Sequence, residues 1–326
     1  MPQNVRCLSR MTPAVAALLA GAMLCASAQA ALSQSCMPHR SLPKIVLKNM
    51  GECDFNLDAL EYRGTPVEQA KCLMRGLDQT RNLGPPLDSL PDALASRIGR
   101  DTGLPSREIL SAYLSKQDLE WDFAAHLWQP VSRAEDNNPQ APAARYFVIH
   151  DTSGPNYGHR AFPDDVDSTA KFNNLSNYYC ADGWGKAHVV VNRSGDMIVD
   201  HDFGIPWRET KFERAVDFVG TLKGLFLHIE MIQPRRSAPG YSRYNDAQPP
   251  SPSFTTAQYD RLALLYTIAS VRSGNWLIPA FHAAIDAEIP NGHDDPLNFD
   301  IDSFANSLDR LAEKLGQPVV VQAAHQ

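Results

Sequence analysis

Short apolar runs in the second half of the chain constrain its fold more than any other feature. Residues 145–150 (RYFVIH) and 225–232 (LFLHIEMI) have the length and composition of buried strands, and 187–199 has the pattern of a hairpin. Residues 255–273 and 303–315 have the apolar spacing of helices. Because strands and long helices bury their apolar sides against one another, the pattern predicts an α/β domain with a central mixed β-sheet flanked by helices.

The first residues of the chain have the pattern of an export signal. Arg6 and Arg10 precede the apolar run 11–24, which leads to a small-residue cleavage site at 28–30 (AQA). The apolar run is too short for a membrane-spanning helix, which needs about 20 residues. We therefore expect residues 1–30 to be a signal peptide and the protein to be exported, to the periplasm or as a secreted protein, with no transmembrane segment after cleavage.

A smaller, mainly helical and loop-rich module is expected at residues 31–135. Thr65, followed by Pro-Val-Glu, has the pattern of a capping box at a helix start, and 106–119 carries a helical apolar stripe. Residues 130–144 are rich in Pro, Ala, Asn and Asp, a composition typical of a linker. We therefore place the second domain at 136–320. The first module carries no recognisable chemistry, and its role is open.

Cysteine spacing and charge argue against two kinds of function. The cysteines after the signal segment are Cys36, Cys53, Cys72 and Cys180, and they form no C-x-x-C unit that would indicate a cysteine-based metal site. Export permits disulfides, and among the alternative pairings we expect a local link between Cys53 and Cys72. The formal net charge is −7 and no Lys/Arg block occurs, so binding to nucleic acid is not expected.

Histidines and acidic residues lie where these elements meet loops. His150 ends an apolar strand and is followed by the polar residues 151–154 (DTSG), a position where sites often form in such sheets. His282 and Asp295 are separated by a loop that contains Pro and Gly. Imidazole and carboxylate are ordinary zinc ligands, and three protein ligands leave a fourth position for water. The alternatives are a structural core histidine at 150 and a solvated turn around 295.

A titratable pair lies within the strand at 225–232. His228 and Glu230 are two residues apart, so their side chains point to the same face of the sheet. Leaving either group unpaired in a dry core would cost several kcal/mol. We therefore expect these side chains to face either a partner or a cavity, and Glu230 is the candidate for a functional role. The alternative is a His228–Glu230 pair that only satisfies itself.

The order of these motifs resembles that of the zinc N-acetylmuramoyl-L-alanine amidases of the type-2 amidase family, which are related to peptidoglycan recognition proteins and T7-type lysozyme. The resemblance covers about residues 146–300. The motifs that carry it are VIHDT at 148–152, AHVVVNRSGD at 187–196, HIEM at 228–231, the capped helix from Thr255, His282, and DDP at 294–296.

This resemblance implies a metal site and a reaction. His150, His282 and Asp295 match the family's zinc ligands, with Asp294 as a competing ligand because the loop is slightly long. Glu230 matches the catalytic acid of the family. The implied activity is hydrolysis, by a zinc-bound water, of the amide bond between N-acetylmuramic acid and L-alanine in peptidoglycan or muropeptides, with Zn²⁺ as the cofactor.

The chain departs from the family pattern at two places. His293 stands where the family usually has a lysine two positions before the aspartate ligand, and we expect it to stabilise the developing oxyanion as a catalytic group. Where many members have Ala-Trp-His, this chain has Pro followed by Trp207 and Arg208. His188 matches a histidine that precedes the hairpin strand of the family. We expect His188, Trp207 and Arg208 to shape the substrate pocket.

Two other functions are compatible with the same residues. A non-catalytic peptidoglycan-binding module of the recognition-protein type can keep this fold without hydrolysis. A zinc peptidase acting on another amide is the second alternative, because zinc and one carboxylate suit many hydrolases. The presence of all three candidate ligands favours an enzyme over a binding module.

Overall fold

The computed structural model describes residues 53–77, 82–119, 123–178, 187–215, 220–287 and 289–316. The expected signal peptide at 1–30, Cys36 and Cys180 lie outside the described residues. No helix in the described part of the chain is long and apolar enough to cross a membrane.

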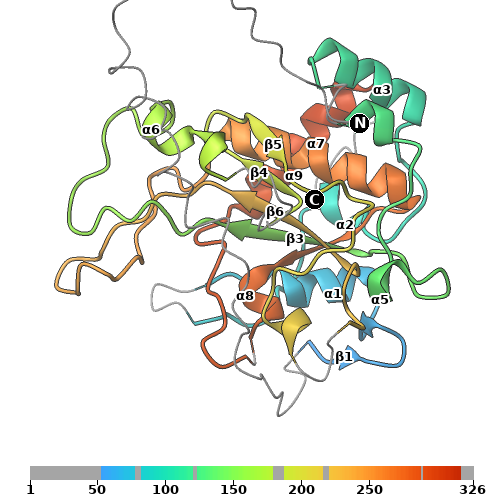
Figure 1. Ribbon diagram of the computed structural model, residues 1–326, viewed down its shortest axis with the longest axis horizontal. Helices are drawn as coiled ribbons and strands as arrows, with labels where there is room; N and C mark the ends of the chain where they lie inside the picture. The colour runs from blue at the N-terminus through green and yellow to red at the C-terminus, as the bar shows by residue number, and fades with distance from the viewer. Residues whose placement is uncertain are drawn as a thin grey trace, which may run out of the picture. The chain divides into compact units, whose positions relative to one another are not determined.

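A five-stranded mixed sheet forms the centre of the fold, with the strand order β5-β4-β6-β3-β7 (Figure 1). The inner strands β6 and β3 are parallel to their neighbours β4 and β7, and only β5 is antiparallel, to β4. The predicted mixed sheet is therefore confirmed: the two apolar runs supply β3 and β6, the predicted hairpin supplies β4 and β5, and the edge strand β7 was not predicted. The strands are β3 (Tyr146–Asp151), β4 (Val189–Val191), β5 (Met197–Val199), β6 (Phe226–Met231) and β7 (Ile278–Phe281).

Helices cover both faces of the sheet, as alternating side chains of β3 show. Phe147 packs edge-on against Tyr266 of helix α7 (Thr256–Ser273), with ring centroids 5.3 Å apart. Tyr146 points to the opposite face, where its hydroxyl donates to Gln69 of helix α1 (Pro66–Leu73) over 2.9 Å. Side chains of even number in β3 therefore face the side of α1, and His150 belongs to this set.

The ends of the long helices follow from their capping residues. Thr255 and Gln258 form the expected capping box at the start of α7, and Gly274 ends it in the left-handed conformation. Helix α9 (Ile301–Lys314) packs on α7 and begins two residues earlier than the sequence predicts. The N-cap is Asp300, whose carboxylate accepts from the Ser303 backbone amide and so starts the helix before the first residue of the apolar stripe.

The N-terminal part of the described chain consists of short elements that pack on this sheet. The capping box of Thr65 and Glu68 at the start of α1 is confirmed, and so is the predicted disulfide between Cys53 and Cys72. Buried residues of this part and of the sheet form one hydrophobic core, while the predicted boundary at 135/136 stays a prediction. Its elements are β1 (Phe55–Asn56), β2 (Glu61–Tyr62), α2 (Asp92–Ala95), α3 (Arg107–Lys116), the 3-10 turn η2 (Ala124–His126) and α5 (Ala134–Asn137).

The stretch 130–144 is packed rather than a loose linker. Ser132 and Ala144 are fully or almost fully buried, and the Ala144 amide donates to the Ser132 carbonyl over 2.8 Å. Ser132 also donates from its hydroxyl to the Gly224 carbonyl. The missing side chain of Gly224 lets this backbone approach closely, since a Cβ on Gly224 would lie 2.1 Å from the Arg133 carbonyl oxygen. The small residues that resemble linker composition therefore serve close packing.

Four further short elements complete the described chain. They are α6 (Ala170–Asn173), the 3-10 turns η3 (Leu175–Asn177) and η4 (Phe212–Arg214), and α8 (His282–Ile285).

Candidate metal centre

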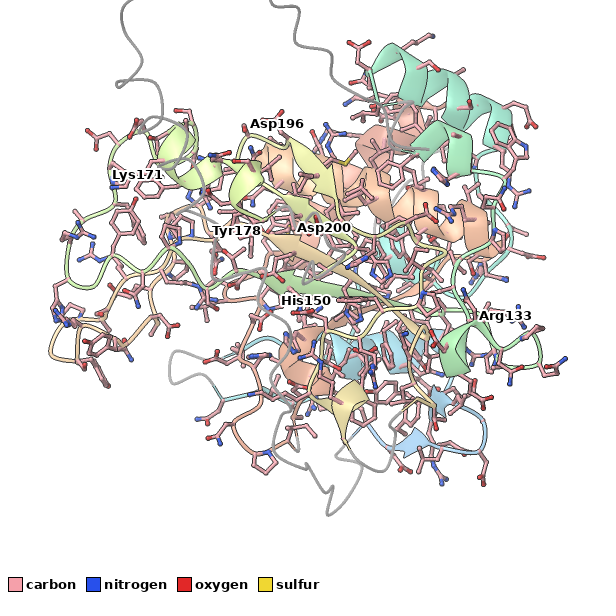
Figure 2. All side chains as sticks on the ribbon, in the orientation of Figure 1. Arg133, His150, Lys171, Tyr178, Asp196 and Asp200 are labelled. Atoms are coloured by element: carbon pink, nitrogen blue, oxygen red, sulfur yellow. A yellow bond between two sulfur atoms is a disulfide. The ribbon has the colours of Figure 1, made fainter. Side chains whose placement is uncertain are left out.

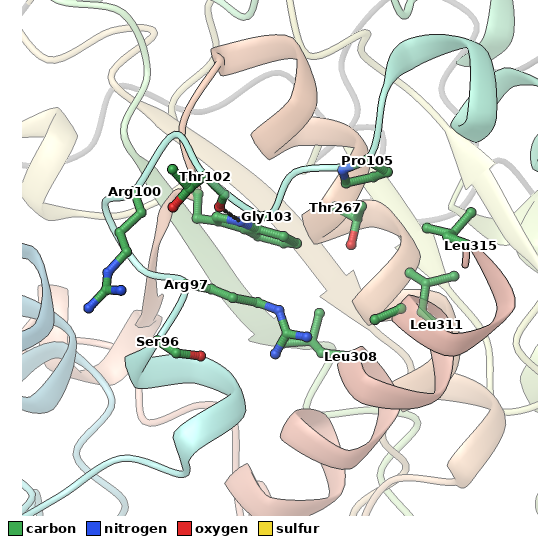
Figure 3. A pocket seen from close by; sticks show the side chains of 12 residues that line it. Ser96, Arg97, Arg100, Thr102, Gly103, Pro105, Thr267, Leu308, Leu311 and Leu315 are labelled. Carbon is green, nitrogen blue, oxygen red and sulfur yellow. Dashed lines mark hydrogen bonds between the residues drawn. The ribbon is translucent and has the colours of Figure 1, made fainter. Parts of the chain in front are cut away.

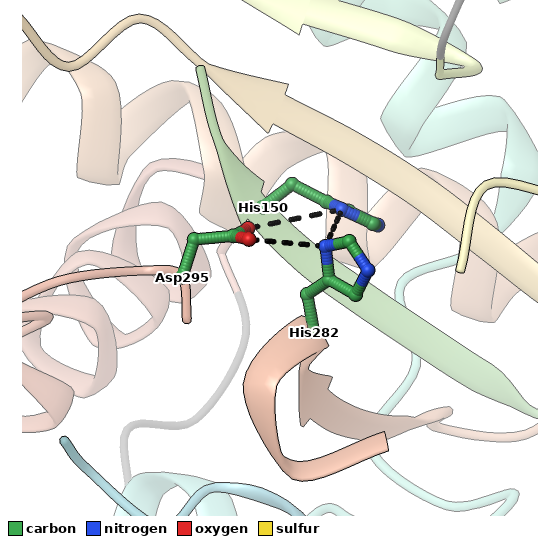
Figure 4. A group of neighbouring side chains, drawn as sticks. All are labelled: His150, His282 and Asp295. Atoms are coloured by element: carbon green, nitrogen blue, oxygen red, sulfur yellow. Dashed lines mark hydrogen bonds and ion pairs between the residues drawn. The ribbon is translucent and has the colours of Figure 1, made fainter. Parts of the chain in front are cut away.

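The three expected metal ligands meet at the carboxyl ends of neighbouring strands (Figure 4). His150 lies near the end of β3, and His282 directly follows β7, which pairs with β3 in parallel. Asp295 comes from the loop that precedes α9. Because neighbouring parallel strands end at the same edge of a sheet, residues distant in the sequence are brought together there.

The ligand atoms of this group face one another at short distances. His150 Nδ1 and His282 Nδ1 are 2.9 Å apart, and His282 Nδ1 lies 3.1 Å from Asp295 Oδ1. His150 Nδ1 lies 3.9 Å from Asp295 Oδ2. All three residues are buried, and together they could hold a metal ion. In the described chain the group includes Asp295 and not Asp294, which is the outcome that the sequence favours.

Backbone contacts fix Asp295 to both elements that carry the histidines. Its carboxylate accepts from the backbone amide of Asp151 over 3.1 Å, at the end of β3. Its carbonyl accepts from the amide of Ala283 over 2.8 Å, in α8. The loop that delivers the carboxylate is therefore tied to β3 and to α8, and the ligand set is held by regular structure.

The electrostatics of the group suit a bound cation. Burial, and then the nearby ring of His282, lower the pKa of His150 well below its usual value, so this ring stays neutral and keeps a lone pair. Burial alone would lower the pKa of His282, but the carboxylates of Asp295 and Asp286 raise it well above its usual value. The two carboxylates thus favour positive charge at His282, beside the ligand atoms of His150 and Asp295. A nitrogen and carboxylate donor set around such a point fits a divalent transition metal.

Two buried carboxylates that the sequence analysis did not name lie on the side of the histidines that faces away from the ligand atoms. His282 Nε2 lies 3.1 Å from Asp286 Oδ2, four residues further along the chain. His150 Nε2 lies 3.0 Å from His228 Nδ1, and the other ring nitrogen of His228 lies 3.2 Å from Glu213 Oε2. The i, i+4 spacing could have indicated Asp286. Glu213 has no such signal, because its segment lacks helical or strand periodicity.

Glu230 faces a cavity beside the metal group. It is the β6 partner of His150 in the parallel register, so both side chains lie on the same face of the sheet. The cavity measures about 320 Å³, and Thr152, Lys171 and Tyr178 also line it (Figure 2). Burial, and then the charge of Glu230, raise the pKa of Tyr178 to about 12. Both outcomes expected for this strand, a partner or a cavity, therefore occur. His228 has Glu213 as its carboxylate partner, and Glu230 faces the cavity.

His293 lies on the outer side of His282. Its Nδ1 is 2.9 Å from His282 Nε2, the ring nitrogen that points away from His150 and Asp295. Burial, and then the ring of His282, lower the pKa of His293 to about 4. The structure thus brings His293 to the site, next to Asp286, with a neutral ring at pH 7. Its role as an oxyanion-stabilising group stays a prediction.

The three residues expected to shape the pocket differ in their burial and in their contacts. His188 is fully buried, and its ring accepts from the His228 amide at Nδ1 and lies 3.2 Å from the Ile205 carbonyl at Nε2. Trp207 stacks on His201 with centroids 4.0 Å apart, and its carbonyl accepts from Gly224, at the opposite end of β6 from Glu230. Arg208 is half-buried. Contact of these side chains with a substrate stays a prediction.

A second cavity lies away from the metal group, between α2, α7 and α9 (Figure 3). It measures about 260 Å³ and is lined by apolar residues of α9 together with Trp276 and Arg97. Arg97 is engaged in an ion pair with Asp309 over 2.9 Å. A second described group that could hold a metal ion shares His282 and consists of His282, Asp286 and His293. Neither this group nor the group of His150, His282 and Asp295 lines the second cavity.

Comparisons with known proteins add no relative to this description. No protein family model, no curated protein and no solved structure matches the chain. The geometry of the site therefore carries the functional argument.

Proposed function

We propose that the chain is a zinc amidase that hydrolyses the bond between N-acetylmuramic acid and L-alanine in peptidoglycan or its fragments. The observation that carries the proposal is the convergence of His150, His282 and Asp295 at one sheet edge. These are the residues that match the zinc ligands of the type-2 amidase family. A mixed sheet flanked by helices is compatible with the fold of that family, and the Cys53–Cys72 disulfide is compatible with export.

Zinc is the metal that best suits the donor set. Two imidazoles and one carboxylate are a common arrangement for catalytic zinc, and bound zinc supplies Lewis acidity toward a carbonyl oxygen and a water molecule. The carboxylates of Asp295, Asp286 and Glu213 are all buried here. Because buried negative charge is costly unless it is paired, a divalent cation at the centre of the group would offset much of that cost.

Glu230 is the residue of this chain best positioned to move a proton. It lies on the strand next to His150, on the same face, and opens into the cavity. In the proposed reaction its carboxylate accepts a proton from the attacking water and delivers it to the departing nitrogen of L-alanine. Such positioned acid–base catalysis contributes about 10²–10⁴-fold to the rate. Lys171 and Tyr178, which line the same cavity, would contact the substrate.

Digestion of purified peptidoglycan tests the proposal. Mass analysis of the products should show stem peptides with a free L-alanine amino group and intact glycan chains, and a chelator should abolish their release. Metal analysis should find zinc in the wild-type protein and little in His150→Ala and His282→Ala. The Glu230→Gln variant should retain zinc but cleave about 100-fold more slowly or worse.

Other outcomes would identify the competing functions. Binding to peptidoglycan with no products would indicate a recognition module. Cleavage within the stem peptide, with the lactyl amide intact, would indicate a zinc peptidase. Full zinc retention in both histidine variants would overturn the metal assignment.

A further inference from the structure

Both histidines of the metal group turn the same ring nitrogen toward its centre. Nδ1 of His150 and Nδ1 of His282 face each other and Asp295, which leaves each Nε2 on the outer side. A neutral imidazole carries its proton on one nitrogen and a lone pair on the other. A metal can therefore bind at Nδ1 only if the proton of each ring is kept on Nε2.

The outer nitrogen of His150 leads to a buried chain of two further groups. His150 Nε2 lies 3.0 Å from His228 Nδ1, and His228 Nε2 lies 3.2 Å from Glu213 Oε2. The contact between His228 Nε2 and Glu213 Oε2 is electrostatic and does not have hydrogen-bond geometry. Because a carboxylate is negatively charged and offers no proton, Glu213 still favours the His228 tautomer with its proton on Nε2. His228 Nδ1 then has a lone pair and accepts from His150 Nε2. This leaves the Nδ1 lone pair of His150 for a metal.

Loss of the carboxylate would remove this preference. If the proton of His228 moved to Nδ1, it would point at His150 Nε2, and the proton of His150 would be driven to Nδ1. That is the atom which a metal needs. Both His228 and Glu213 are fully buried, so water does not take the place of the missing acceptor.

His282 has its own carboxylate and needs no intermediate ring. Its Nε2 lies 3.1 Å from Asp286 Oδ2, which holds the ring proton on Nε2 by the same reasoning. Asp286 Oδ1 accepts from the Phe212 amide over 2.9 Å. The second contact of His282 Nε2, His293 Nδ1 at 2.9 Å, is an acceptor when the neutral His293 carries its proton on Nε2.

One turn of the chain holds both outer carboxylates. Glu213 Oε2 accepts from the Thr210 amide over 3.0 Å and from the Thr210 hydroxyl over 2.9 Å. The neighbouring residue Phe212 donates to Asp286 from its backbone. The segment 209–214 thus orients Glu213 directly and Asp286 through a backbone amide. It reaches both histidines although it supplies no metal ligand.

We propose that Glu213 and Asp286 are positioning residues that fix the Nε2–H tautomers of His150 and His282, and so give the centre its metal affinity. This inference rests on the metal site of the proposed function and not on the identity of the substrate. Partners of this kind commonly account for about 10–100-fold in metal affinity.

The test measures zinc affinity of the full chain by competition with a chromogenic chelator. Glu213→Gln and Asp286→Asn keep the shape of each side chain, remove the charge and leave only a neutral, weaker acceptor oxygen beside the histidine. Each variant should bind zinc about 10–100-fold more weakly than the wild-type chain. Asp202→Asn is the matched control. Asp202 accepts from Arg272 in two contacts of 2.7 Å each and belongs to neither metal ligand group, so the zinc affinity of this variant should not change.

A second readout separates positioning from general stability. Nitrogen-15 NMR of the zinc-loaded wild-type protein should show His150 and His282 bound through Nδ1, with protons on Nε2. The thermal midpoint of each metal-free variant, measured beside that of Asp202→Asn, shows whether lost stability accompanies lost affinity. If Glu213→Gln does not fold, Asp286→Asn and the wild-type NMR signature still decide the question.

The outcomes distinguish this inference from the proposed function. Wild-type zinc binding with unchanged affinity in both variants would overturn the positioning role and leave the amidase proposal standing. Metal bound through Nε2 would do the same. A wild-type chain that binds no zinc would overturn both proposals.

Discussion

Replacement of Arg235 by Met should destabilise the protein by about 3 kcal/mol, at the lower end of the range of about 3–5 kcal/mol for breaking a buried ion pair. Arg235 Nη2 donates to both carboxylate oxygens of Asp151, over 2.8 and 2.6 Å, and both side chains are fully buried. Met fills similar volume without charge, so the loss comes mainly from the carboxylate left behind. The amides of Ser153 and Leu297, at 2.7 and 2.8 Å from Asp151, still donate to it and limit the loss.

Urea denaturation of the wild-type chain and of Arg235→Met measures this effect. In a separate thermal denaturation, a loss of about 3 kcal/mol corresponds to a fall in the thermal midpoint of roughly 6–12 °C for a domain of this size. Arg243→Ala is the matched control, since Arg243 lies exposed on the following loop, and its change should stay within about 0.5 kcal/mol.

A double variant tests the physical cause. Adding Asp151→Asn to Arg235→Met removes the unpaired buried charge and should restore part of the lost stability. A change below about 1 kcal/mol in Arg235→Met, or a double variant less stable than either single one, would refute the reasoning.

Two further substitutions test local packing and the disulfide. Gly195→Ala should lower the free energy of unfolding, measured in urea, by about 2 kcal/mol or more, because the glycine has φ +83° and an added Cβ would lie 2.8 Å from the Ala257 carbonyl oxygen. Gly240→Ala is the control: this glycine has the same φ and its added Cβ would meet no atom within 4 Å, so the loss should be smaller. Equal losses would contradict the packing argument. Cys72→Ser opens a link between residues separated by 19 positions and should lower the free energy of unfolding by about 3 kcal/mol, whereas an unchanged urea midpoint would show that the disulfide does not constrain the unfolded chain.

The elements that the sequence predicts well are those with local signals. The inner strands β3 and β6 are apolar along their whole length and buried throughout, so a short apolar run suffices to identify them. Capping residues identify the start of α1 and both ends of α7. The apolar stripe of α9 places its start at 303, two residues late, because the capping residue Asp300 and the first turn precede the stripe.

The sequence did not predict features that depend on contacts between residues distant along the chain. Residues 130–144 have the composition of a linker, but the small side chains of Ser132 and Ala144 allow close packing instead. Glu213 and His228 come from a turn and a strand, and no periodicity joins them. The rule that buried titratable groups need partners still predicted that His228 would have one or face a cavity. It could not name Glu213, because that choice depends on how the turn folds back on β6.

The ligands and their supports differ in predictability for the same reason. His150, His282 and Asp295 belong to motifs whose order along the chain carries the resemblance, so each could be named singly. Asp286 and Glu213 contact rings of histidines instead of the metal position. Only the i, i+4 spacing from His282 marks Asp286, and no local pattern marks Glu213. Sequence reasoning therefore reaches the atoms that would touch a metal more readily than the groups that orient those atoms.

The N-terminal segment, which the sequence leaves without a role, contacts the turn that holds the two carboxylates. Phe55 and Tyr62 lie 5.4 and 6.2 Å from Phe212, measured between ring centroids. The Cys53–Cys72 disulfide ties the start of this segment to α1, which covers the face of the sheet that carries His150. Because Phe212 donates its amide to Asp286 and precedes Glu213, packing on its ring restrains both carboxylates. The N-terminal segment thus packs on the 209–214 turn, which contacts both carboxylates.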